Sequence, residues 1–241
     1  MNRALQISAS KQKLVQAAAE KIIENLDAAV RKRGRCSVAL AGGTTPRAIY
    51  ALLATENYRS RVEWPKVFLF WGDERTVPPD HPDSNFRMVN ESLLSHIAMP
   101  AANIVRIKGE RDPVSAASEY EKQLENFFGA GIPQFDLILL GLGDDGHTAS
   151  LFPGTNALAE TQRNVLSVFV PKLNTYRITL TLRVINNARR VMFLIAGRSK
   201  AAIVSRVAES KQPTHDLPAT LVQPRNGQLD WLLDGEAASL L

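Results

Sequence analysis

Apolar residues recur along the chain in two patterns that take turns from one end to the other. Residues 11–32 place Leu14, Ala18 and Ile22 on one side at helical spacing, which predicts an amphipathic helix that ends at Gly34. Short unbroken apolar runs such as "CSVALA" and "FDLILL" lie between the helical stretches. Such runs are typical of strands that are buried on both faces of a sheet.

The same two patterns assign most of the remaining chain. Apolar runs predict strands at residues 36–41, 66–72, 135–143, 164–170, 177–182 and 190–197. Helical spacing predicts further helices at 47–54, 84–97, 115–129 and 199–210, and no element is assigned to the closing residues 230–241. Strands that alternate with helices predict an α/β fold, in which a mostly parallel sheet carries helices on both faces. No linker or repeat interrupts the pattern, so we expect one domain over residues 1–241.

Composition narrows the setting of the protein. The 241 residues are 45% hydrophobic and 22% charged, and the one cysteine, Cys36, lies within a strand pattern and is expected in the core. A single cysteine excludes an intramolecular disulfide and fits a reducing compartment. The first residues lack the apolar core of a signal peptide, and no apolar run reaches the roughly 18 residues that span a bilayer. We therefore expect a cytoplasmic protein with no membrane partner.

The positive charge does not point to nucleic acid. The net charge is +5, but the 29 Lys and Arg residues are spread along the chain. The densest cluster, "RKRGR" at 31–35, falls at a predicted helix end, where cations are favourable. Neither aromatic residues nor a recognition motif accompany it, so we expect no nucleic-acid partner.

The stretch "GLGDDG" at 141–146 follows a strand pattern and matches the dinucleotide-binding motif G-x-G-x-x-G. Its chemistry is wrong for that role, because Asp144 and Asp145 would place two negative charges against a pyrophosphate. The acidic residue that the motif requires about 20 residues later is also misplaced, since Glu160 precedes the next strand instead of ending it. We therefore expect these glycines to serve another purpose.

Asp145, Gly146 and His147 form a candidate centre for proton transfer. In extended backbone, residues two apart point to the same side, so Asp145 and His147 are expected to face one cleft. Imidazole transfers protons near neutral pH, and a neighbouring carboxylate holds the ring and favours its protonated form. The alternative is a loop histidine with no chemical role, and the residues alone leave it open.

Two other segments follow predicted strands and offer contacts for an anion. In "GGTTP" at 42–46, Thr45 is expected to cap the next helix, and free N–H groups at a helix N-terminus bind phosphate. In "GDER" at 72–75, charged side chains follow a strand directly. Arg177 and Lys200 begin later elements and are further candidates to reach an anion. A well-capped turn, an exposed charged loop and solvated basic residues are the plain alternatives.

Little in the sequence supports a metal site or nucleophilic catalysis. None of the four histidines, His81, His96, His147 and His215, forms a close pair with another, and no H-E-x-x-H motif occurs. Ser150 lies near His147 but not in a G-x-S-x-G elbow. We expect neither a metal site nor a covalent intermediate.

Taken together, several segments resemble those of 6-phosphogluconolactonases. "LAGGTTP", "FWGDERTVPPDHPDSNFRM", "DLILLGLGDDGHTASLFPG", "RITLTL" and "AGRSKA" occur in that family's order between about residues 38 and 210. The resemblance implies a cofactor-free enzyme that hydrolyses 6-phospho-D-glucono-1,5-lactone to 6-phospho-D-gluconate in the pentose phosphate pathway. It also implies a fold shared with glucosamine-6-phosphate deaminases and ribose-5-phosphate isomerases.

The resemblance also assigns roles to residues of this chain. It implies that His147 is the base that activates water, with Asp145 as its acidic companion and Arg75 in the cleft. The residues that it implies for binding the substrate or its phosphate are Gly43, Thr44, Thr45, Asp73, Arg177 and Lys200. Many family members carry a proline-rich segment before "RIT", whereas this chain has "PKLNTY" at 171–176, so the resemblance leaves open this wall of the cleft and the reach of Arg177.

Two other functions are alternatives to the lactonase. An aldose–ketose isomerase or deaminase of the same fold would use the Asp-Gly-His loop to move a proton between sugar carbons, but "HTASLFPG" favours the lactonase. A sugar-phosphate-binding regulator would need a DNA-binding domain, for which the chain has no room. We expect a small-molecule sugar-phosphate lactone as the partner, and a monomer or a weak homo-oligomer.

Overall fold

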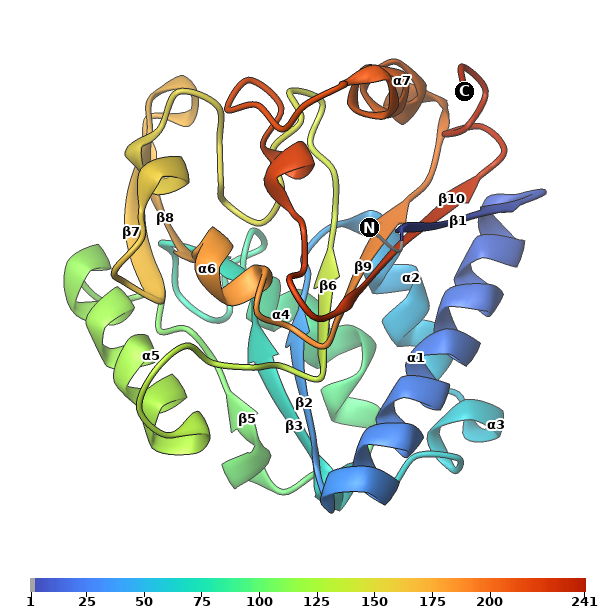
Figure 1. Cartoon of the computed structure of the whole chain (residues 1–241). Coiled ribbons are helices and arrows are strands. Elements are labelled where there is room, and N and C mark those ends of the chain that lie inside the picture. The colour runs from blue at the N-terminus through green and yellow to red at the C-terminus, as the bar shows by residue number, and fades with distance from the viewer. Residues whose placement is uncertain (1–2) are drawn as a thin grey trace.

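The computed structural model describes residues 3–241 and is built around a sheet of seven parallel strands (Figure 1). Their spatial order is β1-β10-β9-β6-β2-β3-β5, and every neighbouring pair is parallel. The strands are β1 Arg3–Ser8, β2 Cys36–Leu40, β3 Val67–Trp71, β5 Ile104–Val105, β6 Leu137–Leu140, β9 Arg190–Ile195 and β10 Gln228–Asp234. The predicted α/β fold with a mostly parallel sheet is confirmed.

A second sheet lies beside the first and is antiparallel. It contains β4 Asp73–Arg75, β8 Thr175–Leu180 and β7 Val165–Val170, in that spatial order. Residues 164–170 and 177–182 were therefore rightly predicted as strands, but they leave the parallel sheet. Residues 73–75, expected to follow a strand as a charged loop, form a strand of their own. The pattern also missed β1 and β10, which pair with each other along their full length.

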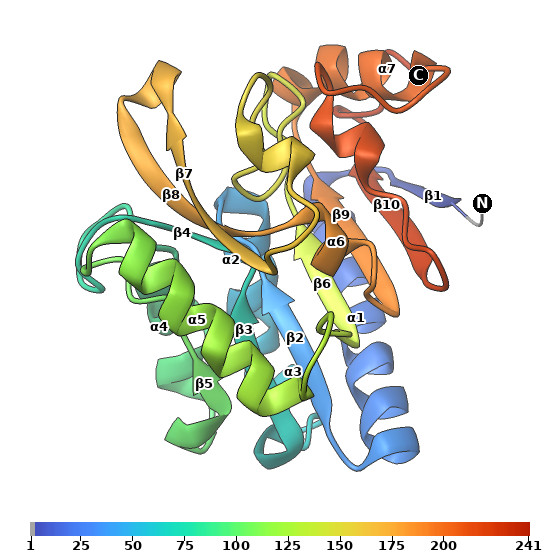
Figure 2. The same cartoon turned by 60° about the vertical axis from the view of Figure 1, so that its left-hand side comes forward.

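Helices lie on both faces of the large sheet, with α1 and α2 on one face and α5 on the other beside the small sheet (Figure 2). The helices are α1 Lys11–Arg33, α2 Thr44–Leu53, α3 Glu56–Arg59, α4 Asn85–Ser92, α5 Pro113–Phe128, α6 Leu182–Ile185 and α7 Ala201–Glu209. The predicted end of α1 is confirmed, because Gly34 takes the left-handed conformation with φ 75° that glycine adopts without a Cβ clash.

The core explains why the strands are unbroken apolar runs. All residues of β2 and β6 are buried, and Cys36 is among them, as expected. Alternate side chains of β3 point to opposite faces, so Phe70 packs edge-on against Phe127 of α5 at 5.1 Å between ring centroids. The Tyr120 hydroxyl of α5 donates to the Trp71 carbonyl and accepts from its N–H, both at 2.9 Å, which anchors the end of β3.

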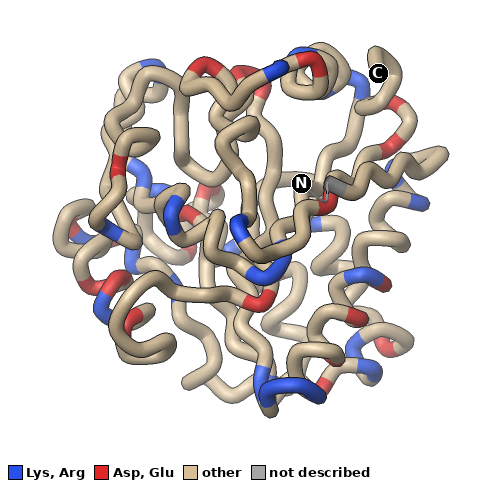
Figure 3. The backbone as a smooth tube through the Cα atoms, viewed as in Figure 1, with Lys and Arg blue, Asp and Glu red and all other residues tan. Residues whose placement is uncertain are grey.

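Basic and acidic positions are interspersed along the backbone in the view of Figure 3, so the net charge of +5 is not gathered on one face of that view. Within the cluster at 31–35, Arg31 pairs with Asp27, Arg33 pairs with Asp136, and Arg35 lies over the Phe127 ring. No helix among residues 3–241 is long and apolar enough to cross a membrane.

Candidate active site

A cavity of about 500 Å³ opens at the carboxyl edge of the parallel sheet. Strands β9, β6, β2 and β3 are consecutive neighbours, and the segment after each of them contributes to the wall. Ligands of open α/β sheets bind at this edge, near the point where two adjacent strands are continued in opposite directions across the sheet. Here those strands are β2, which leads to β3 on one side, and β6, whose next strand in this sheet is β9 on the other side. Eight of the nine predicted site residues line the cavity: Gly43, Thr44, Thr45, Asp73, Arg75, His147, Arg177 and Lys200.

The ninth residue, Asp145, lies against His147 instead of lining the cavity. Its Oδ1 is 2.5 Å from His147 Nδ1 and also accepts from the His147 backbone N–H at 3.2 Å. The two side chains meet as expected, but the reason given from extended backbone is wrong. The loop is a tight turn, in which the Gly146 N–H donates to the Gly143 carbonyl at 2.9 Å and Gly146 has φ 83°.

The glycines of this loop make room for the histidine. A Cβ added to Gly143 would lie 2.0 Å from Nδ1 and Cε1 of His147, so the imidazole rests directly on the glycine backbone. Gly146 packs against Leu217 and occupies a left-handed conformation that favours glycine. On its other side the imidazole stacks on Phe152, with 4.0 Å between ring centroids. The His147 imidazole is thus held between Phe152 and Gly143, a glycine of the motif that resembles a dinucleotide site.

The environment of Asp145 keeps it ionised. Burial opposes ionisation of this carboxyl, but hydrogen bonds from Lys172 and His147 outweigh burial and hold the pKa of Asp145 well below its ordinary value. An ionised Asp145 can only accept a hydrogen bond, so Nδ1 of His147 carries a proton and donates it to this bond, which leaves Nε2 as the ring nitrogen able to accept a proton. This is the arrangement that a general base requires.

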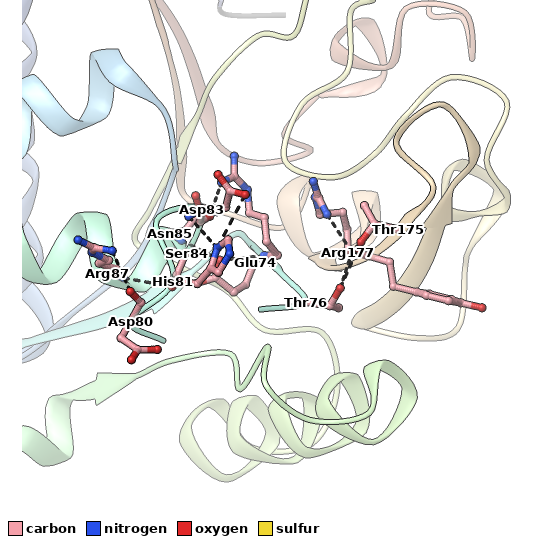
Figure 4. Close-up of polar contacts among 12 residues, drawn as sticks. Glu74, Thr76, Asp80, His81, Asp83, Ser84, Asn85, Arg87, Thr175 and Arg177 are labelled. Atoms are coloured by element: carbon pink, nitrogen blue, oxygen red, sulfur yellow. Dashed lines mark hydrogen bonds and ion pairs between the residues drawn. The ribbon is translucent and has the colours of Figure 1, made fainter. Parts of the chain in front are cut away.

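In the "GDER" segment, the alternation of strand β4 separates the roles of its side chains. Asp73 and Arg75 line the cavity, whereas Glu74 turns away and is 2% exposed. Its carboxylate accepts from the backbone N–H groups of Arg75, Asn85 and Phe86, each at 2.8 Å. Figure 4 shows Glu74 beside Ser84 and Asn85. Burial raises the pKa of Glu74, although these N–H groups act against the rise. Glu74 thus ties β4 to the start of α4 and fixes the direction of its neighbours.

The two arginines that line the cavity lie on neighbouring strands of the small sheet. Arg75 on β4 pairs directly with Arg177 on β8 in the antiparallel register. Burial lowers the pKa of Arg177, and the positive charge of Arg75 lowers it further. Like charges opposed across two strands are unfavourable. The geometry therefore provides a place where an anion would relieve the repulsion.

Asp73 is held by neighbours from two segments, the loop after β6 and the start of α4. The Ser150 hydroxyl donates to Asp73 Oδ2 at 2.6 Å, and Asn85 Nδ2 donates to the Asp73 carbonyl at 3.0 Å. Asn85 in turn requires a glycine at position 42, because a Cβ there would lie 2.0 Å from Asn85 Oδ1. Ser150 is therefore committed to Asp73 and is not placed as a nucleophile beside His147.

The start of α2 differs from the expectation in one respect. Gly43 is the N-cap residue with φ 100°, and Thr44 and Thr45 are the first two helical residues. Thr45 therefore does not cap the helix. It is buried, with 8% of its surface exposed. No side chain accepts a hydrogen bond at this cap, and the N–H groups of the first turn of a helix attract anions. Lys200, across the cavity, is paired with Asp144 at 2.6 Å.

Comparison with known proteins decides the family. Residues 9–231 match the family described as glucosamine-6-phosphate isomerases/6-phosphogluconolactonase. A 6-phosphogluconolactonase from Synechocystis sp. is 42% identical over 236 residues, which cover 96% of this chain and 95% of that protein. This chain belongs to the glucosamine-6-phosphate isomerase/6-phosphogluconolactonase family.

Solved structures agree with this membership of the family. The 6-phosphogluconolactonase from Trypanosoma brucei superposes with a TM-score of 0.87 and is 33% identical in sequence. The match covers 99% of the present chain and 98% of the Trypanosoma brucei chain. A monomeric glucosamine-6-phosphate deaminase has a TM-score of 0.81 at 22% identity, with 100% of both chains covered. At that identity the likeness shows the fold alone, and it confirms the expected fold shared with glucosamine-6-phosphate deaminases.

Two residues of the site were not predicted. Lys172 and Asp144 line the cavity; Lys172 Nζ donates to Asp145 Oδ2, and Asp144 pairs with Lys200. Lys172 lies in the "PKLNTY" segment, which departs from the proline-rich pattern of the family. A basic residue within that departing segment is the sequence signal that could have identified it. Among residues 3–241, no group of three or more His, Cys, Asp or Glu side chains is arranged to hold a metal ion.

Proposed function

We propose that this chain hydrolyses 6-phospho-D-glucono-1,5-lactone to 6-phospho-D-gluconate, as the second step of the oxidative pentose phosphate pathway. The observation that carries the proposal is the His147–Asp145 pair, which is clamped at a cavity also lined by Arg75 and Arg177. A base beside cations suits a substrate that has both an electrophilic carbonyl and a phosphate. Membership of the family and the names of the relatives support the same reaction.

In the mechanism that we propose, His147 Nε2 accepts a proton from water as the water oxygen attacks the lactone carbonyl. The carbonyl oxygen becomes an oxyanion, which Arg75 stabilises. The tetrahedral intermediate then collapses, the bond from the carbonyl carbon to the ring oxygen breaks, and the imidazolium returns its proton to that oxygen. General acid–base assistance of this kind accelerates reactions by about 10²- to 10⁴-fold.

Separate residues of the cavity would bind the phosphate and the sugar ring. We assign the phosphate to the start of α2, with Gly43, Thr44 and Thr45, and to the cations of Arg177 and Lys200. We assign Asp73, whose orientation is held by Ser150 and Asn85, to accept hydrogen bonds from sugar hydroxyls. Binding energy gained at the phosphate would orient the lactone carbonyl for attack by water.

A coupled assay tests the function. Glucose-6-phosphate dehydrogenase generates the lactone in situ, and its disappearance is followed with and without this protein. We expect acceleration over spontaneous hydrolysis, and no release of ammonia from glucosamine 6-phosphate under the same conditions. An unchanged rate of lactone loss would refute the proposal, and release of ammonia would assign the site to a deaminase.

A further inference from the structure

The turn that joins β7 to β8 brings the cation of Lys172 to the loop at 141–147, which carries Asp145 and His147 and is called the catalytic loop below. Residues Pro171–Leu173 form a short 3-10 turn at the end of the antiparallel hairpin, and Lys172 and Leu173 line the cavity. Lys172 Nζ donates to Asp145 Oδ2, while the other oxygen of the same carboxylate, Oδ1, contacts His147 Nδ1. The carboxylate therefore lies between a cation from one sheet and an imidazole from the other.

We propose that Lys172 is a positioning residue for the hydrolysis: it fixes the charge and orientation of Asp145, and through Asp145 the tautomer and orientation of His147. This inference rests on the proposed function for its kinetic consequences, but its structural consequence does not depend on turnover.

The other charges at the cavity are not placed for this role. Asp144 and Lys200 pair with each other, Asp73 accepts from Ser150, and Arg75 and Arg177 face each other across β4 and β8. Within residues 3–241, Lys172 provides the one Lys or Arg ion pair to Asp145. Its removal would leave the carboxylate with His147 alone to offset the cost of burial.

The contact also adds a second point of attachment to the Asp145 carboxylate. Within the loop at 141–147 only Oδ1 is held, by the backbone N–H and by Nδ1 of His147, whereas Lys172 holds Oδ2. Lys172 Nζ lies 6.0 Å from the centre of the Phe152 ring, so from the cavity side it approaches the ring on which the imidazole stacks. A carboxylate held at both oxygens keeps its orientation, and with it the proton on Nδ1.

A double-mutant cycle tests this role. The side chain of Lys172 is 59% exposed, so Lys172→Met is expected to fold. We expect kcat to fall about 3- to 10-fold with little change in KM, because an exposed charge contributes modestly. Lys172→Arg should restore most of the rate. In an Asp145→Asn background, Lys172→Met should have no further effect, since the residue through which it acts has lost its charge. Lys122→Met, which removes an exposed lysine from α5, is the matched control and should be neutral.

Two kinetic outcomes would overturn the proposal. If Lys172→Met had the same effect with and without Asp145→Asn, Lys172 would act independently of that carboxylate. If it raised KM for the phosphorylated lactone and spared unphosphorylated gluconolactone, Lys172 would be a phosphate ligand instead.

A measurement on the resting protein separates this proposal from the proposed function. Nitrogen-15 shifts of the His147 ring, assigned by comparison with His147→Asn, report which nitrogen carries the proton. We expect the wild type to hold the proton on Nδ1 and Lys172→Met to show a mixture of tautomers. An unchanged tautomer in Lys172→Met would sink the positioning role, whether or not the wild type hydrolyses lactone.

Discussion

The catalytic loop and the small antiparallel sheet build the same cavity in different ways. The loop at 141–147 follows one buried strand and carries its acid and its base two residues apart. The small sheet assembles its contribution from β4 at residues 73–75 and from the turn at 171–173 with β8 at 175–180, which are far from β4 in sequence. The two residues that we propose for proton transfer are thus brought together by one local turn, whereas Arg75 and Arg177, which we propose to stabilise anionic groups of the substrate, are brought together by strand pairing.

The largest effect is expected at the centre of the loop. His147→Asn removes the proposed base, so kcat should fall about 10²- to 10⁴-fold in the coupled assay. Circular dichroism and thermal melting should remain near wild type, because the side chain is at the cavity surface. Retention of more than a tenth of the wild-type activity would place the base elsewhere.

Gly143→Ala tests whether the position of the His147 imidazole depends on the glycine that it rests on. The new Cβ would lie 2.0 Å from the imidazole, so the ring must move, and a misplacement near 1 Å costs about 10²-fold in rate. Gly141→Ala is the matched control in the same loop, because its Cβ would meet nothing within 4 Å. Equal losses of kcat in the two variants would show that the loop backbone, and not the imidazole position, is responsible.

Arg177→Ala probes the small sheet. A lost charge-assisted hydrogen bond costs roughly 1.5–3 kcal/mol, so kcat/KM for the phosphorylated lactone should fall about 10- to 150-fold. Unphosphorylated gluconolactone should be hardly affected, because it has no phosphate to lose. Arg75→Ala is the internal comparison and should reduce turnover of both substrates if Arg75 stabilises the oxyanion. A uniform loss in Arg177→Ala would move Arg177 to the reaction centre.

The smallest effect concerns the pH dependence of stability. Because the folded pKa of Asp145 is lowered, its contribution to stability is present above its unfolded value of about 3.9 and is lost as pH falls toward the lowered value. The difference in urea midpoint between the wild type and Asp145→Asn should therefore be larger at pH 7 than at pH 3. A difference that grew at pH 3 would contradict an ionised Asp145 in the fold.

The sequence predicted the elements that local patterns control. Helix α1 was predicted over nearly its full length, since an amphipathic stripe and Gly34 are both local signals. Strands β1 and β10 were missed: β1 lies at the sheet edge with Leu5 and Ile7 exposed, and it pairs with the far end of the chain. The start of α2 was placed too late because Gly43, not Thr45, is its cap.

The chain of residues alone established which chemistry was available. The run from the end of β6 through His147 identified an acid, a base and glycines at a strand end, and excluded a dinucleotide there on charge. That reasoning succeeds because neighbours in sequence are neighbours in space when a tight turn holds them. It also gave the right pair of residues for a wrong geometric reason, since extended backbone does not bring them together.

Only the tertiary structure decided what surrounds that pair. Pairing of β4 with β8 sets Arg75 against Arg177, and the β7–β8 turn delivers Lys172 to Asp145. The pattern of apolar positions assigns a residue to a strand but does not say which strand becomes its neighbour. Register between distant segments depends on how the whole core packs, and that packing turns separate charged residues into one site.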